Sequence, residues 1–136
     1  MPKFVLKEID AIKGSRHKIF KLEIDGKCQF DIFEANITEE KQYFSEFTTL
    51  TSYMQIYADG QRLPDKKLNV IHLNIKDVSA YEFKSKNLRI YFFYTSQDPG
   101  RIITLCGYKN QQKSDIAKFQ SLIKRYLSLL SGLIFP

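Results

Sequence analysis

The residues with the clearest potential for chemistry are cations on two predicted strands and in the loop that follows them. The stretch 81–94 combines an apolar, aromatic β pattern with three cations, and a second strand at 100–108 leads into a polar basic loop. The cations are Lys84, Lys86, Arg89, Lys109 and Lys113. Cations held on a rigid sheet, with no carboxylate cluster beside them, suit a polyanion such as RNA.

This set of cations fits phosphodiester chemistry that needs no metal ion. An arginine such as Arg89 can hold a phosphate with two hydrogen bonds, and lysines can stabilise the extra negative charge on phosphorus in the transition state. RNA has its own nucleophile, the 2′-hydroxyl, so the protein needs only to orient it, assist its deprotonation and stabilise charge. Tyr91 or Tyr108 can stack on a base. The alternative is that the cations are a solubilising face of the sheet.

Other catalytic templates are absent from the sequence. It contains no GxGxxG or P-loop motif for nucleotide phosphates and no GxSxG elbow. His17 and His72 have no ligand partners at metal spacing, so we expect no metal ion and no cofactor. Cys28 and Cys106 are far apart and lie among apolar residues, which indicates packed thiols rather than a disulfide framework, a zinc site or a nucleophile.

Length, composition and charge indicate one globular domain with an uneven charge. The chain has 136 residues, of which 43% are hydrophobic, enough for a real core. Residues 1–60 contain 8 Lys and Arg against 10 Asp and Glu, whereas residues 61–136 contain 13 against 5, so the second half holds the positive excess. No apolar run approaches the roughly 18 residues that span a bilayer, and the first residues lack the apolar core of a secretory signal. We therefore expect a cytoplasmic protein.

The first half of the chain predicts two strands and a long helix. Residues 3–11 are compatible with a short strand, and residues 18–24 alternate in polarity as a half-buried strand does. Residues 39–58 repeat apolar side chains at spacings of three and four, which indicates a helix with one apolar face. We expect Thr38 to be the N-cap of this helix and Gly60, just past its end, to be its C-cap glycine.

The segment between the second strand and this helix allows two interpretations. Asp25-Gly26 is a turn signal, but a two-residue hairpin would set Ile24 opposite Lys27, an apolar residue across from a polar one. A three-residue loop with Gly26 in the left-handed region would repair that register. We favour the other option, a helix that begins near Cys28, because phenylalanines follow it at helical spacing.

The second half predicts an antiparallel meander and a last helix. Strand patterns occupy the segments 70–76, 80–86, 88–95 and 101–108. The final helix starts at Ser114 or Asp115, and the tail 133–136 is apolar enough to dock or to mediate assembly. This order predicts an α+β fold, with an N-terminal strand and helices packed on one face of an antiparallel sheet and a C-terminal helix. The other face would stay free.

Strand periodicity predicts how the cations are placed. Lys84 and Lys86 share one face of their strand because side chains alternate with a period of two, and Arg89 shares a face with Tyr91 on the next strand. If the strands 88–95 and 101–108 pair as a hairpin, the basic loop follows the end of the neighbouring strand. The cations would then converge on one open face.

In their order and spacing, these segments resemble the RelE/ParE superfamily of bacterial type II toxins, nearer its HigB and phage Gp49-like branch. Residues 24–33 are similar to the family's opening strand, Asp-Gly-Lys turn and first helix. Residues 81–93 resemble its tyrosine-plus-basic strand and the strand that follows, which reads LRIYFF here. Residues 100–109 resemble its last strand and basic loop, and residues 112–115 with a basic helix complete the order.

The resemblance implies a single RelE-like domain over residues 1–136, in which residues 1–17 are an N-terminal extension. It also implies a metal-independent endoribonuclease, an mRNA interferase that for many family members cleaves mRNA at the ribosome. By carry-over, Arg89 holds the phosphate, while Lys84 and Lys86 assist proton transfer or stabilise charge. Lys109 takes the place of an arginine after the last strand. RNA binding would fall to Tyr91, Tyr108 and Lys113.

Two positions depart from the family pattern. Glu82 stands where the family has the first basic residue of its strand motif. Asp115 falls near the place of the C-terminal tyrosine, and the terminal catalytic histidine of some HigB-like members has no counterpart.

The partners that the resemblance implies are an antitoxin protein, mRNA and the ribosome, with no membrane. The antitoxin would bind across the helices or the basic face and form a toxin–antitoxin hetero-oligomer, and the free toxin would arrest growth. Two alternatives remain open. One is a ParE-like toxin that binds DNA gyrase and cleaves nothing, and the other is a catalytically inactive binding module.

Overall fold

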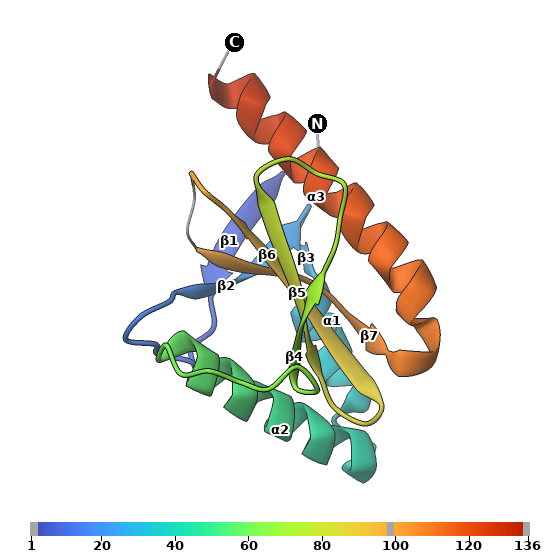
Figure 1. Cartoon of the computed structure of the whole chain (residues 1–136). Helices are drawn as coiled ribbons and strands as arrows, with labels where there is room; N and C mark the ends of the chain where they lie inside the picture. The colour runs from blue at the N-terminus through green and yellow to red at the C-terminus, as the bar shows by residue number, and fades with distance from the viewer. Residues whose placement is uncertain (1–2, 98–99, 135–136) are drawn as a thin grey trace.

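A mixed β-sheet forms the centre of the molecule, with helices on both of its faces (Figure 1). The computed structural model describes residues 3–97 and 100–134. The elements are β1 (Phe4–Glu8), β2 (Ile19–Ile24), β3 (Lys27–Cys28), α1 (Gln29–Ile37), α2 (Lys41–Ala58), β4 (Leu68–Ile71), β5 (Val78–Lys84), β6 (Leu88–Thr95), β7 (Arg101–Tyr108), the 3₁₀-helix η1 (Lys109–Gln111) and α3 (Gln112–Ile134). The predicted α+β class is confirmed.

We had predicted an antiparallel sheet, but the sheet is mixed. Its strand order is β1-β2-β7-β6-β5-β4, and β3 pairs with β2. The strands β2 and β7 are parallel, with Ile19 opposite Arg101, while the other pairs are antiparallel. Parallel neighbours need a crossover connection, which α1, α2 and the β4–β6 meander together provide. The order of the strands along the sequence does not show that β2 and β7 pair.

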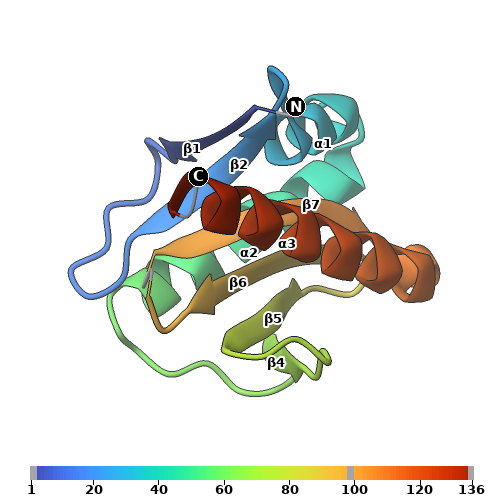
Figure 2. The ribbon, with the colours of Figure 1, turned by 90° about the horizontal axis from the view of Figure 1, so that it is seen from above.

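The prediction of one free sheet face is wrong, because each face has its own core. The helices α1 and α2 cover one face through side chains such as Phe33, Phe47 and Leu50. The helix α3 covers the other, where Phe119 packs against Tyr91 and Phe93 (Figure 2). The cause is visible in β6, whose first six residues are all buried. A strand that is apolar on both faces needs cover on both.

The segment after β2 contains both structures that we had treated as alternatives, a tight hairpin and a helix. Asp25 and Gly26 form a two-residue turn with φ of 52° and 81°, and Ile24 lies opposite Lys27. We had not favoured this two-residue hairpin, because it sets an apolar residue opposite a polar one. The pairing lasts only through Cys28, after which α1 begins, so a single mismatched pair is tolerated. The predicted helix near Cys28 is confirmed.

The junction between α1 and α2 differs from the prediction. Thr38 is the C-cap of α1, not the N-cap of α2, and its hydroxyl donates a hydrogen bond to the carbonyl oxygen of Glu34 at 2.7 Å. The helix α2 begins at Lys41 after Glu40. Its predicted end is confirmed, since Gly60 has a φ of 84° and donates its N–H to Tyr57 at 2.9 Å.

The meander confirms two strands and shifts two others. The bounds of β6 and β7 match the predicted segments, whereas β4 and β5 each begin two residues earlier than predicted. Residues 72–77 lie outside the strands. The helix α3 begins at Gln112, two residues before the predicted start. Residues 98–99, between the predicted strands 88–95 and 101–108, and residues 135–136 of the apolar tail lie outside the described residues.

Both cysteines are packed in the core. Cys28 and Cys106 are buried and free, and burial raises the pKa of each thiol. This agrees with the prediction of packed thiols. No helix in the described ranges 3–97 and 100–134 is long and apolar enough to cross a membrane.

Candidate functional site

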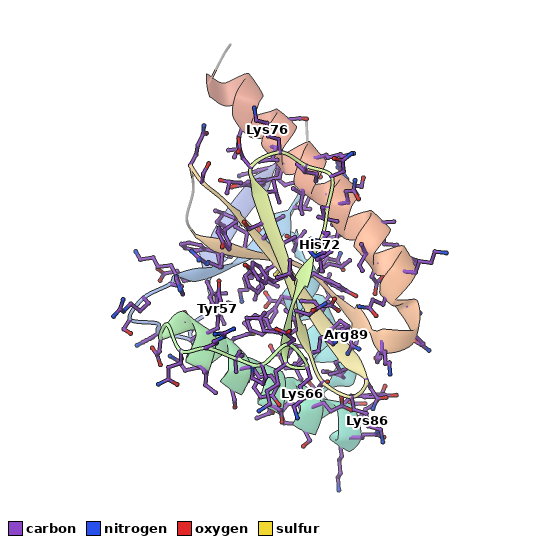
Figure 3. The ribbon with its side chains drawn as sticks, viewed as in Figure 1. Tyr57, Lys66, His72, Lys76, Lys86 and Arg89 are labelled. Atoms are coloured by element: carbon purple, nitrogen blue, oxygen red, sulfur yellow. The ribbon has the colours of Figure 1, made fainter. Side chains whose placement is uncertain are left out.

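Four of the five predicted cations gather at one end of the sheet, which we call the basic end and define as Lys84, Lys86, Lys109 and Lys113. Three segments build it: the β5–β6 turn, η1 after β7, and the first turn of α3. The backbone N–H of Lys109 donates to the carbonyl oxygen of Asn87 at 2.8 Å, which sets the end of β7 beside the turn. Lys86, Lys109 and Lys113 are exposed, and Lys84 is half-buried. Lys86 lies at the turn, near the start of α2 (Figure 3).

A further cation, Lys67, lies beside the basic end and was missed in the sequence. The backbone N–H of Lys84 donates to the carbonyl oxygen of Lys67 at 2.8 Å. The Lys67 ammonium lies 5.1 Å from the centre of the Tyr53 ring. The run Asp-Lys-Lys at 65–67 looked like a mere connection. Its position just before an edge strand was the signal that these charges would lie against β5.

Arg89 does not join the lysines in open solvent, which corrects the predicted convergence. Its side chain is on the face covered by α3 and only 4% exposed. The atom Nη1 donates to the carbonyl oxygens of Ser85 at 2.7 Å and Leu88 at 2.8 Å, and Nε lies 3.3 Å from Glu82 Oε1. The guanidinium is therefore part of an internal ion pair, opposite Lys84 in the β5–β6 ladder.

A buried polar cluster surrounds Arg89 beneath the first turns of α3. Its members are Glu82, Arg89, Tyr91, Gln112 and Asp115. Gln112 Nε2 donates to Glu82 Oε1 at 2.6 Å, which ties α3 to β5. Within the described part of the chain, three buried atoms have no hydrogen-bond partner: Arg89 Nε, Tyr91 Oη and Asp115 Oδ2. A cluster that leaves buried polar atoms unpaired holds its helix less firmly than an apolar contact would.

Asp115 reaches the sheet because β7 has a glycine at the contact. A Cβ on Gly107 would overlap Asp115 Oδ2, so a side chain at position 107 would push α3 outward. Burial raises the pKa of the Asp115 carboxyl. Glu82 and Asp115, the two departures from the family pattern, thus lie on the same covered face as Arg89.

Tyr91 is not available as a base-stacking residue. The ring is fully buried and packs against Phe119, with ring centres 5.5 Å apart. Burial, followed by the nearby charges of Glu82 and Asp115, raises the pKa of Tyr91. The sequence placed Tyr91 on the correct face of β6 but could not show that α3 lies over that face.

Tyr108 lines an open pocket of about 300 Å³ at the basic end. The lining residues are Tyr43, Asn87, Tyr108, Lys109 and Asn110. Tyr43 comes from the first turn of α2 and was not singled out in the sequence, because nothing local links it to β7. Burial, with smaller contributions from Glu40 and Tyr43, raises the pKa of Tyr108, so its phenol stays neutral at physiological pH.

Glu46 of α2 holds the β5–β6 turn in place. Its carboxylate accepts hydrogen bonds from Ser85 Oγ at 2.5 Å, from the Asn87 backbone N–H at 2.8 Å and from Asn87 Nδ2 at 2.7 Å. Burial alone would raise the pKa of Glu46, but these three bonds and the Lys86 charge outweigh it and lower the pKa. The ionised carboxylate of Glu46 is therefore held in a fixed place beside the basic end.

Glu46→Gln is expected to destabilise the fold in a pH-dependent way. Because folding lowers the pKa of Glu46, its stabilisation is present above the ordinary value of 4.5 and is lost as the pH falls through the lowered value. The difference in Tm between wild type and variant should therefore shrink from about pH 6 to about pH 3. Glu39→Gln, which removes the same charge from an exposed carboxylate, is the matched control. A Glu46→Gln difference that stays constant over this range would contradict the assignment.

The described residues contain no group of three or more His, Cys, Asp or Glu side chains placed to hold a metal ion. The residues of the basic end and its pocket can neutralise charge through lysines, stack on a base through a tyrosine and form hydrogen bonds through amides. Comparisons with protein-family models, curated proteins and solved structures found no match for this chain. The family resemblance stays a prediction.

Proposed function

We propose that the protein is the toxin of a type II toxin–antitoxin system, a metal-independent endoribonuclease that acts on mRNA at the ribosome in the cytoplasm. The observation that carries the proposal is the gathering of lysines from three segments beside an open pocket lined by two tyrosines. Lysines neutralise a phosphate backbone, and a tyrosine stacks on an unpaired base. The order of β2, α1, β5, β6, β7 and α3 also agrees with the order that the family resemblance implies.

In this proposal Arg89 holds the scissile phosphate, which requires α3 to move. Glu82 and the carbonyl oxygens of Ser85 and Leu88 engage the guanidinium, and the first turn of α3 covers it. A phosphate would replace Glu82 as the partner of Arg89 once Gln112 and Asp115 lift away. Tyr91 Oη and Asp115 Oδ2, which are buried without a hydrogen-bond partner, reduce the free energy needed for that opening.

The burial of Arg89 also favours a second candidate, an RNA-binding module that does not cleave. If the Arg89–Glu82 pair never opens, the lysines still bind a phosphate backbone, but no arginine stabilises the transition state. In either case an antitoxin with an acidic or amphipathic segment would suit the basic end.

In vitro translation followed by primer extension tests the proposal. Cuts in phase with codons, together with growth arrest on expression, would support the nuclease. Binding of RNA without cuts would support the second candidate, and inhibition of DNA supercoiling without cuts would indicate a ParE-like toxin. Lys86→Ala/Lys109→Ala should abolish the cuts, whereas Lys124→Ala, at an exposed position in the middle of α3, should not.

The salt dependence of RNA binding should report the number of lysines involved. Four lysine–phosphate contacts predict a slope of log K against log salt of about −2.8 for single-stranded RNA. Each substitution of Lys84, Lys86, Lys109 or Lys113 by alanine should reduce the magnitude by about 0.7. Binding is measured with 2′-O-methyl RNA, which cannot be cleaved. An unchanged slope in all four variants would show that RNA binds elsewhere, and Lys124→Ala is the control for general charge.

A further inference from the structure

The pocket at the basic end has the size and lining of a site for a single nucleotide. Its volume of about 300 Å³ lies at the lower limit of the range for small-molecule pockets, roughly 300–1,000 Å³. Two aromatic rings, one ammonium group and two amides line it, which is the usual mixture of apolar surface and a few directing polar groups. The pocket lies outside the contact between α3 and the sheet, so a ligand can reach it without any movement of α3.

The aromatic part of the pocket is a fixed surface. The Tyr108 ring is packed against Phe33 and Tyr43, with each pair of ring centres 5.3 Å apart. The Tyr43 and Tyr108 planes meet edge-on at 68°, so the two rings do not stack on each other. A base that stacks on a ring already held in place loses less conformational freedom than one that must order a mobile side chain.

The polar part of the pocket offers an oriented acceptor. Asn87 uses its backbone N–H and its Nδ2 on Glu46, and its backbone oxygen accepts from Lys109. Its Oδ1 and the second N–H of its Nδ2 are then left for a ligand. The Oδ1 acceptor pairs with a ligand that carries an N–H donor. Asn110 is exposed and adds an amide with both a donor and an acceptor.

We propose that this pocket binds one nucleotide of single-stranded RNA through a base that carries an exocyclic amino group. The base stacks against Tyr108 and Tyr43, its amino group donates to Asn87 Oδ1, the Asn110 amide meets the rest of its edge, and Lys109 binds the phosphate. The ligand class rests on the proposed action on RNA, but the site is independent of Arg89 and of any cleavage.

The direct test is an NMR titration of the ¹⁵N-labelled protein with adenosine 5′-monophosphate. A single nucleotide should bind with a Kd on the order of 1 mM, and the shifted amide resonances should be those of residues 43, 87 and 108–110. Purine riboside 5′-monophosphate, which lacks the amino group, should bind about 2–10-fold more weakly. Ribose 5-phosphate, which lacks the base, should leave the Tyr108 resonance unmoved.

Variants at exposed positions test the site without disturbing the core. Lys109→Ala and Asn110→Ala should each weaken adenosine 5′-monophosphate binding about fivefold, and Lys124→Ala should not change it. Equal affinity for the two purine nucleotides, or shifts confined to other parts of the molecule, would overturn the proposal.

The nucleotide titration and the cleavage assay can give opposite results, so the pocket and the proposed function are tested separately. If nucleotides shift the pocket resonances but the protein makes no cuts in mRNA, the pocket is supported and the proposed nuclease activity is excluded. Codon-phased cuts by a protein whose pocket resonances do not respond to any of the nucleotides would support the nuclease and overturn the pocket.

Discussion

Replacing Arg89 with alanine is expected to lower the free energy of unfolding by about 3–5 kcal/mol, a large share of the stability of a small domain. The Arg89 and Glu82 side chains are 5% and 3% exposed, so the pair is almost fully removed from water. Alanine would leave the Glu82 carboxylate buried with Gln112 as its remaining hydrogen-bond donor. Urea unfolding measures the change as a lower midpoint with an unchanged m-value.

A double substitution separates the loss of the pair from the loss of the arginine itself. In Glu82→Leu/Arg89→Met both charges are replaced by apolar side chains, so no charge stays uncompensated, and most of the stability should return. A single Arg89→Ala variant that unfolds at the wild-type urea concentration would show that Arg89 and Glu82 are not buried together. Lys124→Ala, which removes an exposed charge, should unfold close to wild type.

This expectation changes how toxicity experiments are designed. Loss of growth arrest in Arg89→Ala would follow from unfolding as readily as from lost chemistry. Lys86 and Lys109 are exposed, so their substitution tests RNA binding with little effect on stability. Arg89→Lys keeps the positive charge beside Glu82 but lacks the guanidinium fork, and it separates charge from geometry at the phosphate.

Local patterns predicted the elements whose signals are strong along the chain. The bounds of β6 and β7 match because each is a segment of eight residues, rich in aromatic and β-branched side chains, that lies next to turn residues such as Asn87 and Gly100. The helix α2 was found from its spacing, although Phe44, one of the apolar residues that follow this spacing, is 44% exposed. Thr38 was misplaced because a hydroxyl that serves as an N-cap can equally bond back to the carbonyl four residues earlier.

The relations between distant segments could not be predicted in the same way. Nothing in β2 or β7 alone indicates that they pair in parallel, since that depends on the path of some eighty intervening residues. Periodicity placed Arg89 and Tyr91 on one face, but whether that face was open depended on α3. The six buried residues in β6, apolar or aromatic apart from Arg89, were the available signal for cover on both faces.

In the candidate site too, the residues that are close in sequence were predicted and the residues from a distant segment were not. Lys84, Lys86, Lys109 and Lys113 come together because the β5–β6 turn lies beside the end of β7, from which η1 and α3 continue. Tyr43 and Glu46, which complete the pocket and fix the turn, come from a helix forty residues earlier and reach the site only through the tertiary fold. Sequence spacing therefore identified the charges but not the groups that orient them.

A disulfide that locks α3 to β7 is expected to reduce RNA cleavage about 100-fold, if Arg89 must leave Glu82 to hold the phosphate. The pair Gly107→Cys/Asp115→Cys has suitable geometry. A Cβ at position 107 would lie 3.1 Å from Asp115 Cγ, which occupies nearly the place of a cysteine sulfur. In a disulfide the separation of a Cβ from the opposite sulfur is about 3 Å. Cys106 packs in the core under α1 and α2, on the other face of the sheet, so it does not compete for the new thiols.

Cleavage by the same double variant with and without dithiothreitol gives the comparison, because both samples lack Asp115 and differ only in the crosslink. The reduced protein should cleave and the oxidised protein should not, while both bind adenosine 5′-monophosphate equally, since the pocket of Tyr43 and Tyr108 lies outside the contact of α3 with the sheet. Asp115→Cys alone controls for oxidation of other thiols. Equal cleavage by the oxidised and reduced forms would mean that the phosphate is held without Arg89, and the exposed lysines of the basic end would then have to account for the chemistry.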